Sequence, residues 1–136
     1  MITQNKTNRG FTLVEVLIVV GIVAILAAIA YPFYAQYQMR SERSDATGAL
    51  LATWNELERC FVSELDFTAC NDVVPEQSPK GKYSISADLE EAAFKLYAQP
   101  TEGGSQEADD ECQEFTLDHH GQRSSSPGEI KSCWGW

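Results

Sequence analysis

An almost uninterrupted apolar run near the N-terminus constrains this chain more than any other feature. Residues 16–30 contain no charged or polar side chain, and the segment 11–31 is interrupted only by Thr12 and Glu15. About 20 predominantly apolar residues are enough for a helix to cross the hydrocarbon core of a bilayer. The sequence therefore predicts a membrane-spanning helix over residues 11–31.

The charges beside this run predict its orientation. Lys6 and Arg9 precede it and few basic residues follow at once, so the positive-inside rule places the N-terminus in the cytoplasm and the remainder outside. Two alternatives stay open, a plain membrane anchor and a cleaved secretory signal. The latter would use the small residues between Ala27 and Ala30 as its cleavage site.

Glu15 is the unusual residue of the apolar run. An ionised carboxylate in hydrocarbon costs roughly 2.5–3.5 kcal/mol on insertion scales, so such a residue needs a partner or a special use. The position of Glu15 therefore indicates a function beyond anchoring.

The stretch "RGFTLVEVLIVVGIVAILAAIAYP" resembles the class III signal of type IV pilins. This resemblance implies that a prepilin peptidase cleaves between Gly10 and Phe11 and methylates the new Phe11 amine. Residues 1–10 would then be a leader that is removed, and residues 11–31 a helix that is kept in the membrane and in the filament core. The matching residues are Gly10, Phe11, Thr12, Leu13, Val14 and Glu15.

The resemblance also suggests a use for Glu15. Cleavage creates a cationic amine at Phe11, and four residues of helix separate it from Glu15 by roughly 5–6 Å. When subunits stack with an axial stagger, the amine of one subunit can neutralise the carboxylate of another, although a contact within one subunit stays open. Thr12, Gly21 and Pro32 are further assembly residues by resemblance, since the stretch from Gly21 to Pro32 can lose helicity in the filament.

Residues 32–62 are predicted to form the amphipathic second half of the same helix. Apolar residues recur there at spacings of three and four, whereas the charged residues fall mainly off that line. The apolar positions are Ala46, Leu50, Trp54, Leu57 and Phe61, and the charged ones are Arg43, Asp45, Glu56 and Glu58.

Residues 63–136 are predicted to form a small globular head. After a loop rich in proline and glycine, three short segments alternate apolar and polar residues and are predicted to be half-buried strands. The expected fold is α+β: a long N-terminal helix packed on an antiparallel sheet of three to four strands, the type IV pilin fold by resemblance. The inward positions are Tyr83, Ile85, Ala87 and Leu89, then Phe94, Leu96 and Ala98, then Phe115 and Leu117.

The chain has four cysteines, which suits an oxidising compartment. Three pairings are possible, and loop-closure entropy favours the local one, Cys60–Cys70 with Cys112–Cys133. A zinc site is the alternative, but neither pair has the CxxC spacing that helps to bind zinc.

The C-terminal stretch "CQEFTLDHHGQRSSSPGEIKSCWGW" resembles the end of PilE-like minor pilins. The shared features are Cys112, the strand 115–118, Gly121-Gln122, a Ser/Gly-rich loop over 124–128 and Cys133-Trp134. The helix start Arg43-Ser44-Asp45-Ala46 matches as well. The terminal Gly135-Trp136 and the very acidic middle of the chain depart from the pattern.

Other clusters favour no catalytic or metal chemistry. The acidic residues Glu102, Glu107, Asp109, Asp110, Glu111 and Glu114 lack the pattern of a calcium loop and are predicted to form a solvated connection. His119 and His120 are predicted to point to opposite faces of a strand, which argues against a shared metal. We therefore expect no enzymatic activity, no cofactor and no metal.

The net charge of −10 disfavours nucleic acid as a partner, and removing Lys6 and Arg9 would leave 8 basic against 20 acidic residues. We expect a structural subunit of a type IV pilus, PilE-like and minor, that supports twitching motility, adhesion or DNA uptake. A type II secretion pseudopilin and a DNA-binding competence pilin are the alternatives. The implied partners are other pilin subunits, prepilin peptidase and the inner-membrane assembly machinery. The implied location is a single-pass inner-membrane protein with a periplasmic C-terminal domain, then a cell-surface pilus.

Overall fold

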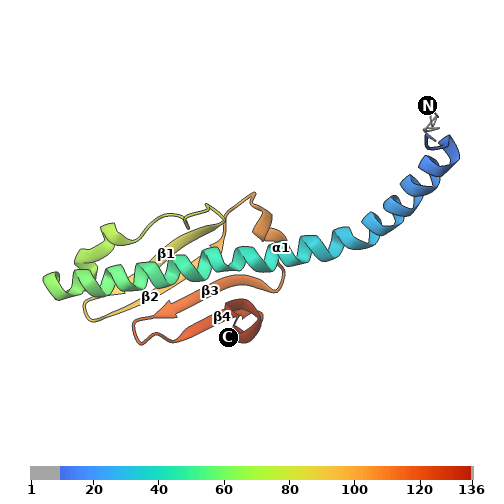
Figure 1. Cartoon of the computed structure of the whole chain (residues 1–136). Helices are drawn as coiled ribbons and strands as arrows, with labels where there is room; N and C mark the ends of the chain where they lie inside the picture. The colour runs from blue at the N-terminus through green and yellow to red at the C-terminus, as the bar shows by residue number, and fades with distance from the viewer. Residues whose placement is uncertain (1–9, 136) are drawn as a thin grey trace, which may run out of the picture. The chain divides into compact units, whose positions relative to one another are not determined.

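The computed structural model describes residues 10–135 (Figure 1). All of the predicted leader except Gly10 lies outside the described residues. The chain divides into two compact units, Met1–Gln36 and Tyr37–Trp136.

Helix α1 (Leu13–Glu64) contains both predicted helical segments and includes Pro32. Its apolar part has a mean hydropathy of 3.0 over 18 residues, so it is long and apolar enough to cross a membrane. In the first unit every described residue, 10–36, is exposed. This part of the helix therefore presents its apolar side chains outward instead of packing them in a core.

The second unit contains a four-stranded antiparallel sheet in the order β1-β2-β3-β4. The expected α+β fold of a long helix with a small antiparallel sheet is confirmed, with four strands. The prediction of a loop over residues 124–128 was wrong for most of that stretch, because "RSSSP" pairs with β3 although it has no apolar alternation. The strands are β1 (Tyr83–Glu90), β2 (Ala93–Pro100), β3 (Cys112–Asp118) and β4 (Arg123–Pro127).

Three short helices lie in segments that the sequence pattern leaves as connections. Asp66 caps η1 (Phe67–Val73) through a hydrogen bond from the Thr68 N–H to its carboxylate. The other two are η2 (Ser105–Ala108) between β2 and β3, and α2 (Ile130–Trp134) after β4.

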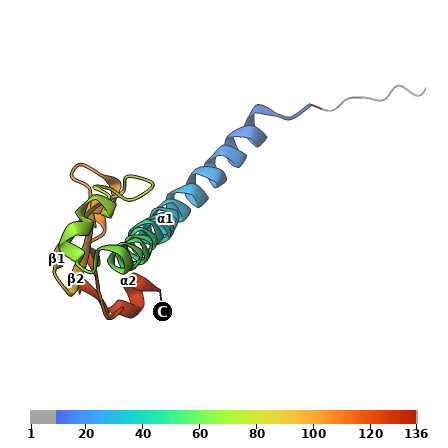
Figure 2. The same cartoon turned by 90° about the vertical axis from the view of Figure 1, so that its left-hand side faces the viewer.

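The core of the second unit lies between α1 and one face of the sheet (Figures 1 and 2). The predicted strand positions fill this core, since Tyr83, Leu96 and Phe115 are fully buried. On the helix, Leu50 and Leu57 are fully buried as predicted. Burying these side chains is the main stabilising term of the fold.

The prediction that charged residues lie off the buried line of α1 was wrong for Arg43 and Asp45. Both are 6% exposed, whereas Glu56 is exposed as expected. Trp54 is only half-buried, although its spacing puts it on the apolar line. Helical periodicity alone misplaced Arg43 and Asp45, because it contains no information about hydrogen-bond partners from distant parts of the sequence.

Candidate functional site

The exposed N-terminal segment carries all the residues that the sequence singles out for processing and assembly. Thr12 precedes α1, and its hydroxyl accepts a hydrogen bond from the Glu15 N–H at 3.2 Å. A threonine followed three residues later by glutamate is the sequence pattern of a capping box. The negative charge of Glu15 also suits the positive end of the helix dipole.

A shallow apolar hollow lies beside Glu15. Phe11, Val16 and Val20 are among its lining residues, and the Phe11 side chain is 83% exposed. Gly10, Gly21 and Pro32 are also exposed, and an added Cβ at Gly10 or Gly21 would meet no atom within 4 Å. The predicted assembly residues therefore lie at the start of α1 and along its exposed first part.

In the second unit, Arg43 on α1 holds the C-terminal region. Its Nε donates to Asp109 Oδ2 at 2.7 Å and its Nη2 to Asp109 Oδ1 at 2.8 Å, a bidentate pair. Nη2 also donates to Glu111 Oε2 at 2.8 Å, and Nη1 donates to the carbonyl of Ser132 at 2.9 Å. We call Arg43, Asp109, Glu111 and the Ser132 carbonyl the Arg43 cluster.

The charges of the Arg43 cluster stabilise one another. Asp109 is only 2% exposed, so its carboxylate needs the guanidinium as a partner. The hydrogen bond to Asp109 raises the pKa of Arg43 against the effect of burial, and Arg43 in turn lowers the pKa of the half-exposed Glu111. The prediction of a solvated acidic connection was therefore wrong for the buried Asp109, whereas Glu111 is exposed as predicted but pairs with Arg43.

Two residues further along α1, Asp45 holds the loop 74–82. Its carboxylate accepts hydrogen bonds from the Ser78 hydroxyl, the Lys80 N–H at 3.1 Å and the Lys82 N–H at 3.4 Å. The Ser78 hydroxyl oxygen also accepts from the Tyr83 N–H at 3.0 Å, which ties the loop to the start of β1. We call these residues the Asp45 cluster.

Gln106 provides a further buried polar contact. Its Nε2 donates to the Tyr83 hydroxyl at 2.8 Å and to the Met39 carbonyl at 3.1 Å, so η2 is joined to β1 and to α1. Burial raises the pKa of Tyr83 to about 12, so the phenol stays neutral at physiological pH.

Both disulfides close local loops. Cys60 is bonded to Cys70 and Cys112 to Cys133, which are the pairs that local closure favours. The residues from Cys112 to Cys133 form what we call the C-terminal loop. Directly after it, Trp134 Nε1 donates to the Ser124 carbonyl at 2.9 Å and so attaches α2 to β4.

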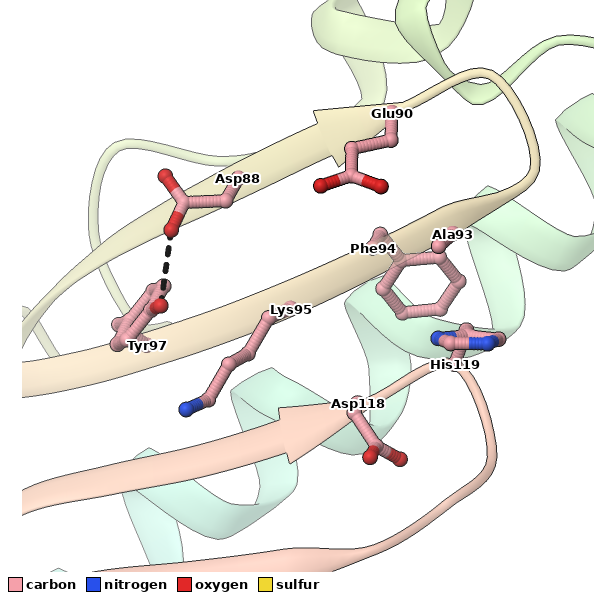
Figure 3. Close-up of a pocket in the computed structure, with 8 residues that line it drawn as sticks. All are labelled: Asp88, Glu90, Ala93, Phe94, Lys95, Tyr97, Asp118 and His119. Atoms are coloured by element: carbon pink, nitrogen blue, oxygen red, sulfur yellow. Dashed lines mark hydrogen bonds between the residues drawn. The ribbon is translucent and has the colours of Figure 1, made fainter.

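The opposite face of the sheet carries a hollow (Figure 3). Figure 3 shows the Tyr97 hydroxyl donating to Asp88, at 2.8 Å, while Lys95 lies between the strands that carry Asp88 and Asp118. This hydrogen bond raises the pKa of Tyr97. The lining residues are Asp88, Glu90, Ala93, Phe94, Lys95, Tyr97, Asp118 and His119.

The histidine prediction was wrong in its geometry. His119 and His120 lie in the turn after β3, and their ring centroids are 3.9 Å apart instead of on opposite faces. Asp109, Glu111 and Cys112 form a compact acid and sulfur group, but Cys112 is in a disulfide and both acids bind Arg43. These three residues therefore do not fit a metal ion.

Sequence reasoning missed the clusters around Arg43 and Asp45 as buried sites. The signal that could have found them is their place beside Ala46 at the start of the apolar line of α1, with Arg43 three residues and Asp45 one residue before it. An unpaired charge is rarely buried, so each of these residues required a partner from the head.

Two family models match consecutive parts of the chain, which together cover residues 5–116. Residues 32–116 match the family described as type IV minor pilin ComP, DNA uptake sequence receptor, and residues 5–31 match the prokaryotic N-terminal methylation motif. The type IV major pilin protein PilA of Myxococcus xanthus is 41% identical over 87 residues, which cover 61% of this chain and 39% of PilA. A type IV major pilin protein PilE1 of Neisseria gonorrhoeae is 50% identical over 96 residues, which cover 64% of this chain and 51% of PilE1.

The chain thus spans about two fifths to half the length of these relatives. Among solved structures, the non-core minor pilin PilV of Neisseria meningitidis has the same fold, with a TM-score of 0.58. It is 19% identical, and the match covers 71% of this chain and 94% of PilV.

Proposed function

The chain belongs to the type IV pilin family, and on this premise we propose that it is a structural subunit of a type IV pilus. The observation that carries the proposal is the exposed apolar helix that begins with a methylation motif and continues into a folded head. A helix without its own core needs lipid or neighbouring helices around it, and the membrane supplies the first and the pilus the second.

Processing follows from the motif. Prepilin peptidase cleaves between Gly10 and Phe11 and methylates the Phe11 amine, so residues 11–31 anchor the subunit in the inner membrane with its head in the periplasm. The match of residues 5–31 and the orientation of the basic leader support this step. The two disulfides suit the oxidising compartment on that side.

Assembly uses the new amine. The Phe11 amine of one subunit meets the Glu15 carboxylate of another, and each charge neutralises the other in an apolar filament core. Thr12 caps the first turn of α1 through the Glu15 N–H, and the Glu15 side chain is exposed at the start of the helix. Gly21 and Pro32 weaken the helix between them, so this segment can lose helicity in the fibre.

The subunit is PilE-like and minor, and its partners are the other pilin subunits and the inner-membrane assembly machinery. Support for minor status comes from the match of residues 32–116 to a minor pilin family, while major pilins are among the relatives as well. We propose no catalytic role, since the polar clusters of residues 10–135 are explained by packing and loop anchoring.

A second candidate function is that of a DNA uptake receptor, which the family description of residues 32–116 favours. The charges of this chain weigh against it, because binding to phosphates relies on available lysine and arginine. Arg43 is buried in its cluster, Lys80 Nζ lies 3.2 Å from Glu42, and Arg59 lies 3.2 Å from Glu56. We therefore rank the structural role first.

Replacing Glu15 with Ala tests the structural role. We expect the variant to be cleaved and methylated normally but to be nearly absent from sheared pili, as counted by mass spectrometry. Glu64→Ala, which removes an exposed acid at the other end of α1, is the matched control and should be incorporated like the native chain. Normal incorporation of the Glu15→Ala variant would contradict the proposed pairing.

Mobility-shift titration of the full-length chain with duplex DNA, at low and moderate salt, tests the second function. We expect weak binding that disappears at moderate salt. Tight binding that prefers one DNA sequence would reverse the ranking of the two functions.

A further inference from the structure

The sheet has an outer face that no element covers within residues 10–135. Alternation along the strands sends Phe94, Leu96 and Ala98 toward α1 and sends Lys95, Tyr97 and Gln99 to the other side. The outer face of β1 carries Asp88 and Glu90, and that of β3 carries Glu114 and Asp118. Four carboxylates and one ammonium group thus share this face.

The hollow of Figure 3 lies at the end of this face, near the β1–β2 and β3–β4 turns. In the figure, the Glu90 and Asp118 carboxylates border it from opposite strands, with the Phe94 and His119 rings at one end and Lys95 between the strands. Its volume is about 320 Å³, enough for the end of one long side chain.

Two of its acids are held in place by the fold. Asp118 Oδ1 accepts hydrogen bonds from the His120 N–H at 2.9 Å and the Gln122 N–H at 2.8 Å, which leaves its second oxygen for other contacts. Asp88 accepts from the Tyr97 hydroxyl at 2.8 Å. Acceptors that are already oriented lose less conformational entropy when a donor binds.

The positive charge of Lys95 on the outer face also disfavours binding of a bare metal ion. Lys95 lies opposite both Asp88 and Asp118 in the strand register, and its Nζ lies 5.3 Å from the centroid of the Tyr97 ring. An ammonium group at this place repels a compact dication. A guanidinium, in contrast, donates in several directions and stacks on aromatic rings, so it can use the acids and the half-buried His119 ring together.

From these contacts we propose that the outer face of the sheet, at its Asp88 and Glu90 end, docks an arginine-bearing segment of a partner protein. One cationic side chain of that segment enters the hollow between Glu90 and Asp118. Charge complementarity selects this occupant, because three carboxylates against one lysine line the hollow and nucleic acid would be repelled. The proposal goes beyond the structural role and does not require it.

Peptide binding to the full-length chain in neutral detergent tests the proposal. The probe is a fluorescein-labelled peptide of alternating arginine and glycine with both ends capped, and its citrulline counterpart serves as the neutral control. The variant Asp88→Asn with Glu90→Gln is compared with Glu64→Gln with Asp72→Asn, which removes the same charge from exposed positions outside the hollow.

We expect the Asp88/Glu90 variant to weaken arginine-peptide binding about tenfold and the matched control to weaken it less than about twofold. Tyr97→Phe, which keeps the ring and removes the hydrogen bond to Asp88, should cause an intermediate loss. Tryptophan fluorescence and intact disulfides establish that each variant is folded.

Three results would overturn the proposal. Equal losses in both double variants would mean that only bulk charge matters. Equal binding of the citrulline peptide would mean that no cation is recognised. Displacement of the peptide by Ca²⁺, beyond that by sodium chloride of equal ionic strength, would mean that the acids form a metal site.

Discussion

Two loops of the head are held by neighbouring residues of α1 in opposite ways. Asp45 is an anion that accepts hydrogen bonds, two of them from backbone N–H groups of loop 74–82. Arg43 is a cation that donates to two carboxylates and one carbonyl of the C-terminal region. A backbone N–H is present in every residue except proline, whereas a carboxylate belongs to a particular side chain. The first loop can therefore vary in sequence and stay attached, while the second depends on Asp109.

Replacing Arg43 with Met should give the largest effect, because it leaves the Asp109 carboxylate buried without its partner. We expect the free energy of unfolding of the head to fall by about 3–5 kcal/mol. Denaturant titration of the full-length chain in detergent, followed by tryptophan fluorescence, measures it. Arg59→Met removes an exposed ion pair with Glu56 and should cost less than about 1 kcal/mol. Similar losses in the two variants would show that the Arg43 cluster is no stronger than a surface pair.

Replacing Asp45 with Ala should destabilise the head less, by about 1.5–3 kcal/mol, since it removes hydrogen bonds to a charged group but leaves no buried charge behind. Amide hydrogen exchange should rise in loop 74–82 and stay unchanged in the C-terminal loop. Lys80→Ala keeps the backbone donor, so it should leave exchange in that loop unchanged. Faster exchange in the Lys80→Ala variant would refute the distinction between backbone and side-chain attachment.

Replacing Gly128 with Ala probes the C-terminal loop without touching a charge. A Cβ at this position would lie 2.5 Å from the Glu111 carbonyl oxygen and 3.0 Å from Cys133 Sγ, so the backbone has to shift. We expect a loss of about 1–3 kcal/mol and faster exchange around Glu111. Ala at Gly121, whose Cβ would meet no atom within 4 Å but whose φ is +76°, separates crowding from backbone strain. A Gly128→Ala chain as stable as the native one would mean that the close contact between residue 128 and the Glu111 carbonyl does not constrain the backbone.

Acidification should give the smallest effect. Arg43 lowers the pKa of Glu111 below its ordinary value of 4.5, so the ionised form is favoured in the folded state. The contribution of Glu111 to stability is therefore complete above pH 4.5 and is lost as the pH falls toward the folded-state pKa. The stability difference between the native chain and Glu111→Gln should shrink over that range, and a difference that is independent of pH would contradict the assignment.

The sequence predicted the helix, three of the strands and their buried faces because apolar spacing reports the side that each element turns to the core. It did not predict β4, since "RSSSP" on an edge strand has no apolar alternation. The Arg43 and Asp45 clusters were not predicted from the sequence, for a different reason. Their contacts join residues 33 to 89 positions apart, and helical periodicity carries no information about such partners.

The placement of the disulfides has a mechanical consequence. The Cys60–Cys70 bridge joins the end of α1 to η1, and the Cys112–Cys133 bridge closes the C-terminal loop, with separations of 10 and 21 residues. Neither bridge links the residues of α1 around Arg43 to the C-terminal loop. A tensile load that passes directly from the helix to that loop is therefore carried by the hydrogen bonds from Arg43 to the Ser132 carbonyl and from Trp54 to the Asp118 carbonyl, and by core packing. Such a joint can yield under force and re-form without any change in covalent bonds.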